Sequence, residues 1–295
     1  MDKTQEIMQQ VRRIEMQARK AATTTFAGQY RSSFRGQGLD FDDFREYMPG
    51  DEPRFIDWKV TARTGTPYVR KFHEEREQAL LLAVDASASM RYGSSAAADS
   101  KLEYAARIAA VLAWSAVQNG DKVGLLLFGC QPHFYLPPSK GMKQCLRIVR
   151  EILFAPAGGR DDTIDDVATE ILQTQRKSAM CFVISDFLSA PDKQAIGKLN
   201  FRHELIPVRV NDPYELELPE TGRFYAQDPE SGEQYLVSTT PALRTAHSKA
   251  MKSHAVEWER TFTQLGVDYL SLLTNHDFVS ELRKLFARRS RMFAR

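Results

Sequence analysis

The sequence predicts an α/β protein in which a mostly parallel sheet is flanked by helices. From about residue 79 onward, short and continuously apolar runs alternate with longer segments of helical periodicity. Strands that are apolar throughout, rather than at every second residue, are typical of parallel sheets covered on both faces. A chain of 295 residues with 43% hydrophobic residues is long enough to bury such a sheet.

Three regions follow one another along the chain. Residues 1–26 are expected to form an amphipathic helix that packs on its own domain or on a partner, because apolar residues recur at spacings of three and four. Residues 27–76 are expected to form a small β-rich module, because short aromatic-containing runs are separated by turn residues such as the Pro49-Gly50 pair. Residues 77–295 are expected to form the main domain, with an inserted loop or small hairpin at about 211–240.

The main domain contains five candidate buried strands and five helical segments. Strands are expected at residues 79–84, 123–128, 180–184, 205–210 and 267–273, and helices at residues 101–117, 142–154, 164–172, 242–262 and 278–286.

The charge of the chain is balanced, with 40 Lys and Arg against 38 Asp and Glu. This balance argues against nucleic-acid binding as a main function. The segment from Arg244 to Arg295 is nevertheless basic, and its charge either stabilises the end of the last helix or serves an acidic partner or nucleic acid. We expect a cytoplasmic protein without membrane insertion, because no long apolar run or signal peptide is present and the three cysteines form no pair in sequence.

Polar residues follow two of the predicted strands where each strand ends. Asp85, Ser87 and Ser89 follow the first apolar run, Asp186 follows the run at 180–184, and Thr163 lies in a loop that leads into a helix. Ligands of open parallel sheets bind beyond the carboxyl ends of the strands. Because all five side chains offer hard oxygen atoms, they favour Mg²⁺, or else Mn²⁺ or Ca²⁺, over zinc or copper.

The order Asp-x-Ser-x-Ser, Thr, Asp resembles the metal-ion-dependent adhesion site (MIDAS) of von Willebrand factor A domains. This resemblance implies that Asp85, Ser87, Ser89, Thr163 and Asp186 hold one divalent cation. It also implies a von Willebrand A-like, Rossmann-type fold for the main domain. Taken alone, Asp85-x-Ser-x-Ser could instead be a turn whose side chains cap the next helix.

A second segment resembles a family hallmark. Residues 45–58, with the sequence REYMPGDEPRFIDW, followed by Ala62-Arg63, are similar to the bacterial family called domain of unknown function fifty-eight, as is the later segment from Asn211 to Glu215. The resemblance implies a partnership with a MoxR-type AAA+ ATPase. We expect the charged residues of the hallmark to be partly buried and paired, so that residues 45–63 clasp the module to the main domain; the alternative is a patch that faces a partner.

These observations predict a non-enzymatic module that binds a carboxylate of a partner protein through a divalent cation. The alternative is a metal-dependent, phosphatase-like hydrolase that uses the same site. The motif supplies no histidine or lysine obviously placed as a base, and the sequence contains neither a P-loop nor a Gly-x-Ser-x-Gly elbow.

Overall fold

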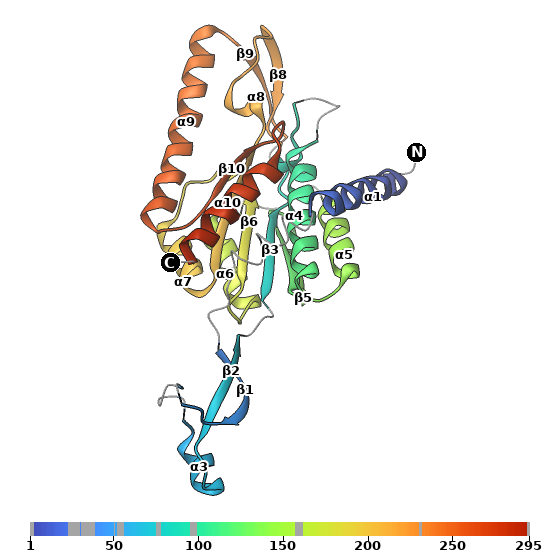
Figure 1. The fold of residues 1–295 in the computed structure, drawn as a ribbon. Coiled ribbons are helices and arrows are strands. Elements are labelled where there is room, and N and C mark those ends of the chain that lie inside the picture. The colour runs from blue at the N-terminus through green and yellow to red at the C-terminus, as the bar shows by residue number, and fades with distance from the viewer. Residues whose placement is uncertain are drawn as a thin grey trace.

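A computed structural model describes residues 3–22, 30, 39–49, 51, 56–74, 78–94, 99–156, 162–229 and 232–293 of the chain. At its centre lies a six-stranded sheet with the strand order β10-β7-β6-β3-β4-β5 (Figure 1). All neighbours in this sheet are parallel except β5, which is antiparallel to β4. The strands are β3 (Ala79–Asp85), β4 (Lys122–Phe128), β5 (Phe134–Ser139), β6 (Met180–Ser185), β7 (Glu204–Asn211) and β10 (Leu270–Leu273).

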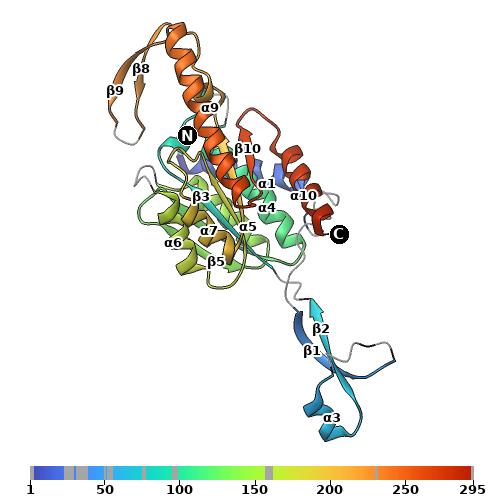
Figure 2. The ribbon, with the colours of Figure 1, turned by 90° about the vertical axis from the view of Figure 1, so that its left-hand side faces the viewer.

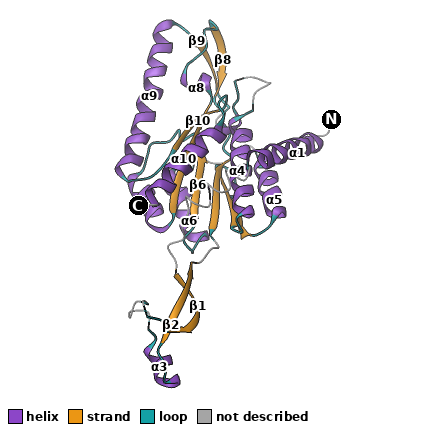
Figure 3. Ribbon diagram, in the orientation of Figure 1, coloured by secondary structure: helices purple, strands orange, loops and turns teal. Residues whose placement is uncertain are grey.

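Helices cover both faces of this sheet, so the predicted α/β fold class is confirmed (Figure 3). One face packs against α1 (Lys3–Ala21), α4 (Lys101–Gln118), α5 (Met142–Leu153) and α10 (Phe278–Phe293). The other face packs against α6 (Ile164–Thr174), α7 (Lys193–Arg202) and α9 (Pro241–Gln264). No helix among the described residues combines the length and apolarity needed to cross a membrane.

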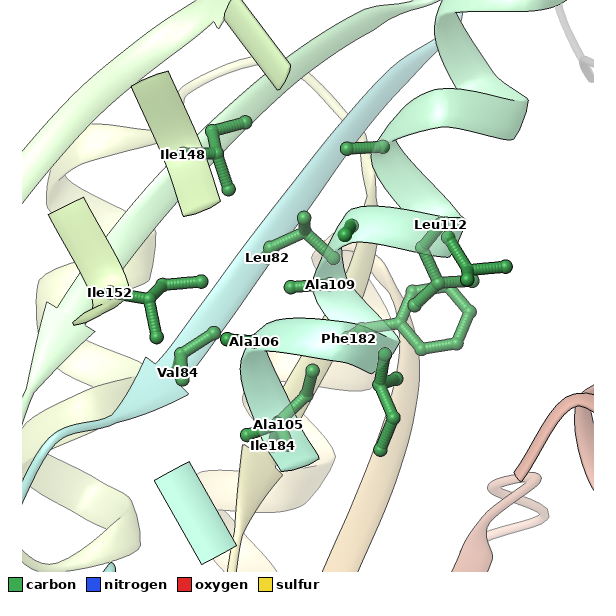
Figure 4. Packing of buried hydrophobic residues seen from close by; sticks show 14 of the residues in the cluster. Leu82, Val84, Ala105, Ala106, Ala109, Leu112, Ile148, Ile152, Phe182 and Ile184 are labelled. Atoms are coloured by element: carbon green, nitrogen blue, oxygen red, sulfur yellow. The ribbon is translucent and has the colours of Figure 1, made fainter. Parts of the chain in front are cut away.

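The larger core lies between the sheet and helices α4 and α5. Leu82 and Val84 of β3 lie beside Phe182 and Ile184 of β6, and all four are fully buried. Figure 4 shows small side chains of α4, such as Ala109, against these strands, with Ile148 and Ile152 of α5 packed beside them on the same face of the sheet. Alanines let a helix approach the sheet closely, and the dense packing holds the ends of β3 and β6 in place.

The N-terminal helix docks on its own chain. Val11, Ile14 and Ala18 of α1 are buried in the same core cluster as α4 and α5. Gln10 also donates a hydrogen bond of 2.6 Å to Glu103 of α4. Of the two alternatives for this helix, the described contacts favour packing on its own domain.

Residues of the hallmark lie in a separate small substructure. It contains an antiparallel pair, β1 (Leu39–Glu46) with β2 (Tyr68–Glu74), and also helix α3 (Trp58–Thr64). In Figures 1 and 2 this substructure stands away from the central sheet, at the end where β3 begins.

The expected clasp is only partly seen. Arg45 and Asp51 do form a two-pronged ion pair, with distances of 2.6 and 2.7 Å, but it lies within the small substructure and Arg45 is exposed. The expected partial burial is wrong for Arg45 and Arg63, which are exposed, and the neighbouring aromatic Trp58 is also exposed, with an exposed fraction of 69%. Asp57 is buried, and it caps α3 by accepting hydrogen bonds from the backbone N–H groups of Lys59 and Val60. Residues 52–55 lie outside the described part.

Strand β5 and helix α7 were not part of the predicted pattern, for local physical reasons. Strand β5 was not expected because it contains Pro137 and Pro138, which an edge strand tolerates but a central strand does not. The short helix α7 carries Gly197 in its middle, which weakens its helical signal. The segment at 211–240 is a short helix, α8 (Pro213–Leu216), and a hairpin of β8 (Arg223–Gln227) and β9 (Gln234–Ser238), as one of the two expected alternatives had it.

The basic segment near the C-terminus is partly used inside the fold. In α10, Arg288 and Arg289 both pair with Asp268, and Arg289 also pairs with Glu204. Arg289 is buried, and desolvation lowers its pKa to about 10. These two arginines therefore fasten α10 to the sheet domain.

Candidate metal site at the carboxyl edge of the sheet

Two aspartates meet where β3 and β6 end. These strands are parallel neighbours, with Val84 opposite Ile184, so the residues that follow them emerge at the same edge. Asp85 ends β3, and Asp186 follows directly after β6; both are buried. The hydroxyl of Ser185 donates a hydrogen bond of 2.6 Å to Oδ2 of Asp85 and so ties the two strand ends together.

The two serines of the motif connect these aspartates. The backbone N–H of Ser87 donates to Oδ1 of Asp85 at 2.9 Å, and the Ser87 and Ser89 hydroxyl oxygens lie 3.1 Å apart. The hydroxyl of Ser89 then donates to Oδ2 of Asp186 at 2.8 Å. A continuous hydrogen-bonded chain thus joins four of the five predicted residues.

A glycine at the end of β4 permits this close arrangement. Gly129 has a φ of 69°, a region that side chains other than glycine rarely adopt. A Cβ atom at this position would lie 2.5 Å from Oδ1 of Asp85 and 2.7 Å from the backbone nitrogen of Ser87. Any other residue would therefore displace the first half of the motif.

Thr163 lies at the edge of the same cavity but is held differently. It is the N-cap of α6, and its hydroxyl and backbone N–H both donate to the carboxylate of Asp166, at 2.8 and 3.0 Å. Its side chain is exposed, and it forms no described hydrogen bond to the other four predicted residues. Residues 157–161, which precede it in the Gly-Gly loop, lie outside the described part of the chain.

A cavity of about 640 Å³ opens above these residues. All five predicted residues line it, and Phe187 and Leu188 add apolar surface. Part of its wall comes from the β8–β9 hairpin, whose lining residues are Ala226, Gln227, Asp228, Pro229 and Tyr235. The inserted segment, which sequence analysis gave no role, therefore borders the candidate site.

Lys101 is a further site residue that sequence analysis missed. Its side chain is fully buried, and its ammonium group lies 2.7 Å from Oδ2 of Asp186 and 2.5 Å from Oε1 of Glu215 in α8. Although burial lowers the pKa of Lys101, the charges of Asp186 and Glu215 outweigh this and raise it. One signal was present: Lys101 opens a helix, where a positive charge is unfavourable unless a partner compensates it.

The two aspartates therefore differ in charge environment. The negative charge of Asp186 is compensated by the ammonium group of Lys101. Asp85 has hydroxyl and amide partners instead; burial, and secondly the charge of Asp186, raise its pKa to about 6. A cation at this edge of the sheet would relieve the cost of ionising Asp85.

The donor set fits a hard divalent cation. The residues offer carboxylate and hydroxyl oxygens, which suit Mg²⁺, Mn²⁺ or Ca²⁺. In the described part of the chain, no cluster of three or more His, Cys, Asp or Glu residues could hold a metal ion by itself. The site thus depends on its hydroxyl groups as much as on its two carboxylates. The three cysteines are buried, and burial raises the pKa of each thiol, so they do not favour soft metals.

Comparison with known proteins gives a family and several relatives. The family model described as "Protein of unknown function DUF58" matches residues 43–257. The uncharacterized protein Rv1480 of Mycobacterium tuberculosis is 32% identical over 286 residues, which cover 95% of this chain and 89% of that protein. The uncharacterized protein MAV169 of Mycobacterium avium is 30% identical over 147 residues, which cover 50% of this chain and 86% of that protein.

Among solved structures, the conserved hypothetical protein BatB from Bacteroides thetaiotaomicron has a TM-score of 0.45 at 15% identity, covering 72% of this chain and 99% of that chain. The VWA domain of SpRpn10 has a TM-score of 0.38 at 13% identity, covering 70% of this chain and 93% of that chain.

Proposed function

The chain belongs to the DUF58 family of proteins of unknown function, and we propose that it is a protein-interaction module that binds a partner's carboxylate through a divalent cation. The cation would be Mg²⁺, or else Mn²⁺ or Ca²⁺, held by Asp85, Ser87, Ser89, Thr163 and Asp186. The partner would be a MoxR-type AAA+ ATPase in the cytoplasm; the resemblance of the hallmark supports this choice.

The observation that carries the proposal is the hydrogen-bonded chain from Asp85 through Ser87 and Ser89 to Asp186, at the floor of a cavity. Ligands of parallel sheets typically bind beyond the carboxyl ends of the strands, which is where these carboxylates and hydroxyls lie. The cavity of about 640 Å³ leaves room for a side chain of a partner above this floor.

The charges explain why such a site would attract a carboxylate. A bound cation would supply a positive centre with a free coordination position. Lys101 already compensates Asp186, so Asp85 is the principal uncompensated charge among the five proposed ligands, and the three hydroxyl ligands are neutral. A divalent ion held this way keeps net positive charge toward the cavity, where an Asp or Glu of a partner can complete its coordination.

A binding experiment tests the proposal directly. The purified MoxR-type ATPase is titrated against the full chain in Mg²⁺ and in EDTA, with Asp85→Ala and the matched control Asp165→Ala, whose side chain is exposed in α6. We expect binding in Mg²⁺ to wild type and control only, and none in EDTA. Equal binding by folded Asp85→Ala, with no effect of EDTA, would refute the cation-mediated mechanism.

The same preparations are assayed for hydrolysis of p-nitrophenyl phosphate, to separate the interaction module from the alternative of a hydrolase. We expect no turnover. Mg²⁺-dependent turnover that disappears in Asp85→Ala would favour the phosphatase-like enzyme instead.

A further inference from the structure

Glu215, in the inserted segment, shares the buried ammonium group of Lys101 with Asp186. The ammonium nitrogen lies 2.7 Å from Oδ2 of Asp186 and 2.5 Å from Oε1 of Glu215. The exposed fractions of the side chains are 0% for Lys101, 3% for Asp186 and 19% for Glu215. Coulomb interactions between buried groups are much stronger than those in water, so each of these charges acts strongly on the others.

The fold holds Glu215 in this place. Its Oε2 atom accepts a hydrogen bond of 3.0 Å from the backbone N–H of Asp212, which completes the capping box of α8. Its carbonyl oxygen lies 2.7 Å from Nε2 of His247 in α9. Oδ2 of Asp212 accepts hydrogen bonds from the backbone N–H of Ser94 at 3.0 Å and from the hydroxyl of Thr274 at 3.3 Å. A capping box needs an acceptor at this position, which glutamine also supplies, so α8 does not require the negative charge.

The ammonium group lies where it opposes the binding of a second cation. Lys101 donates to Oδ2 of Asp186, the same oxygen that accepts the hydrogen bond from Ser89. With Lys101 alone, Asp186 would form a neutral pair that attracts a divalent ion little. Glu215 adds a second negative charge, so the three charged side chains, two negative and one positive, carry a net charge of −1. Neither Lys101 nor Glu215 lines the cavity, so both act from behind Asp186 and occupy no coordination position that faces a partner.

We propose that Glu215 sets the affinity of the cation site by balancing the charge of Lys101. The inference rests on the proposed cation site and gives the inserted segment a second part in it, because α8 supplies a counter-charge while the hairpin borders the cavity. Removing the charge of Glu215 leaves Lys101 to repel the cation. Removing both charges leaves Asp186 as a carboxylate without an ammonium partner. The effect of each residue on cation binding therefore depends on the presence of the other.

The test is a calorimetric titration of the metal-free full chain with Mn²⁺ alone. The variants are Glu215→Gln, Lys101→Met and the double variant that combines them. Glu217→Gln is the matched control, because Glu217 is an exposed glutamate of the same segment. We expect Glu215→Gln to weaken Mn²⁺ binding at least fivefold, Lys101→Met to tighten it at least fivefold, and Glu217→Gln to change it less than twofold. The double variant should bind within threefold of wild type, because it has lost one charge of each sign.

The outcomes separate this inference from the proposed function. If wild type binds no Mn²⁺, the cation site itself is refuted, and this inference with it. If Asp85→Asn abolishes Mn²⁺ binding but folded Glu215→Gln binds like wild type, the cation site stands and only the role of Glu215 is refuted. A double variant that binds as weakly as Glu215→Gln would show that Glu215 acts through the fold and not through its charge. Thermal melts establish that each variant is folded; should one single variant fail to fold, the other decides, and unchanged binding by it would refute the inference.

Discussion

Replacing Asp85 by asparagine should stabilise the metal-free protein at neutral and alkaline pH. The pKa of Asp85 rises from 3.8 to about 6, because burial and then the charge of Asp186 disfavour its ionised form. One pKa unit corresponds to about 1.4 kcal/mol, so ionised Asp85 costs the folded state about 3 kcal/mol at pH 8. Asparagine has a similar shape and carries no such cost.

The sign of the pH dependence follows from proton binding. Between pH 4 and 6 the folded state holds a proton on Asp85 that the unfolded chain has lost, so this residue makes stability fall as pH rises through that window. Above about pH 6 the cost is complete and constant. At pH 5 only about half of it is present, so the advantage of Asp85→Asn should be roughly half as large there as at pH 8.

Urea unfolding in EDTA at pH 5 and pH 8 measures this difference for wild type and Asp85→Asn. Asp165→Asn, on the exposed surface of α6, serves as the control and should follow wild type at both values. An asparagine variant that is no more stable than wild type at pH 8, or an advantage that is the same at both pH values, would refute the reasoning about a buried charge.

Three further pairs of substitutions probe other features of the molecule. Lys101→Met should lower the free energy of unfolding by about 3–5 kcal/mol, because Asp186 and Glu215 lose their buried ammonium partner. Lys101→Arg, which keeps a positive charge, should lower it less, and urea unfolding compares the two variants. Asp57→Ala should lower the stability of helix α3 by about 1 kcal/mol, because the helix loses its N-cap. Faster amide hydrogen exchange in α3 would measure this loss, and Arg63→Ala, at an exposed position, should leave the exchange unchanged. Tyr235→Ala should weaken binding to the proposed ATPase partner at least fivefold without lowering the melting temperature. Tyr225→Ala, which lies on the same hairpin but outside the cavity lining, should leave both quantities unchanged; equal effects of the two substitutions would exclude a role for the cavity wall.

The sheet and its helices could be predicted because their signals are local. The strands β3, β4 and β6 are nearly continuous apolar runs, β7 is apolar apart from Arg209 within residues 205–210, and α4 and α6 begin at Ser100 and Thr163 with full capping boxes. Strand β5 could not be predicted, because its prolines are acceptable only at the edge of a sheet, and edge position is a property of the assembled fold.

The candidate site also has a part that could be predicted from the sequence and a part that could not. Asp85, Ser87, Ser89 and Asp186 stand at strand ends, and their order along the chain, which resembles that of an adhesion site, is enough to group them. The partners of Lys101 could not be predicted. Glu215, which accepts a hydrogen bond from Lys101, lies 114 residues further along the chain. Such contacts depend on crossovers that bring distant loops to one edge.

The candidate cavity is lined both by residues at the ends of central strands and by residues of the β8–β9 hairpin, and these two parts differ in how freely their residues can be substituted. The floor of the cavity is built on central strands, where the core leaves little freedom to substitute residues. The hairpin forms its own two-stranded sheet outside the central one, and the backbone hydrogen bond from Thr239 to Gly222 closes its base. Its loop can therefore change in length and sequence while the floor stays intact. Related chains could keep the same cavity floor and select different partners by exchanging only this hairpin.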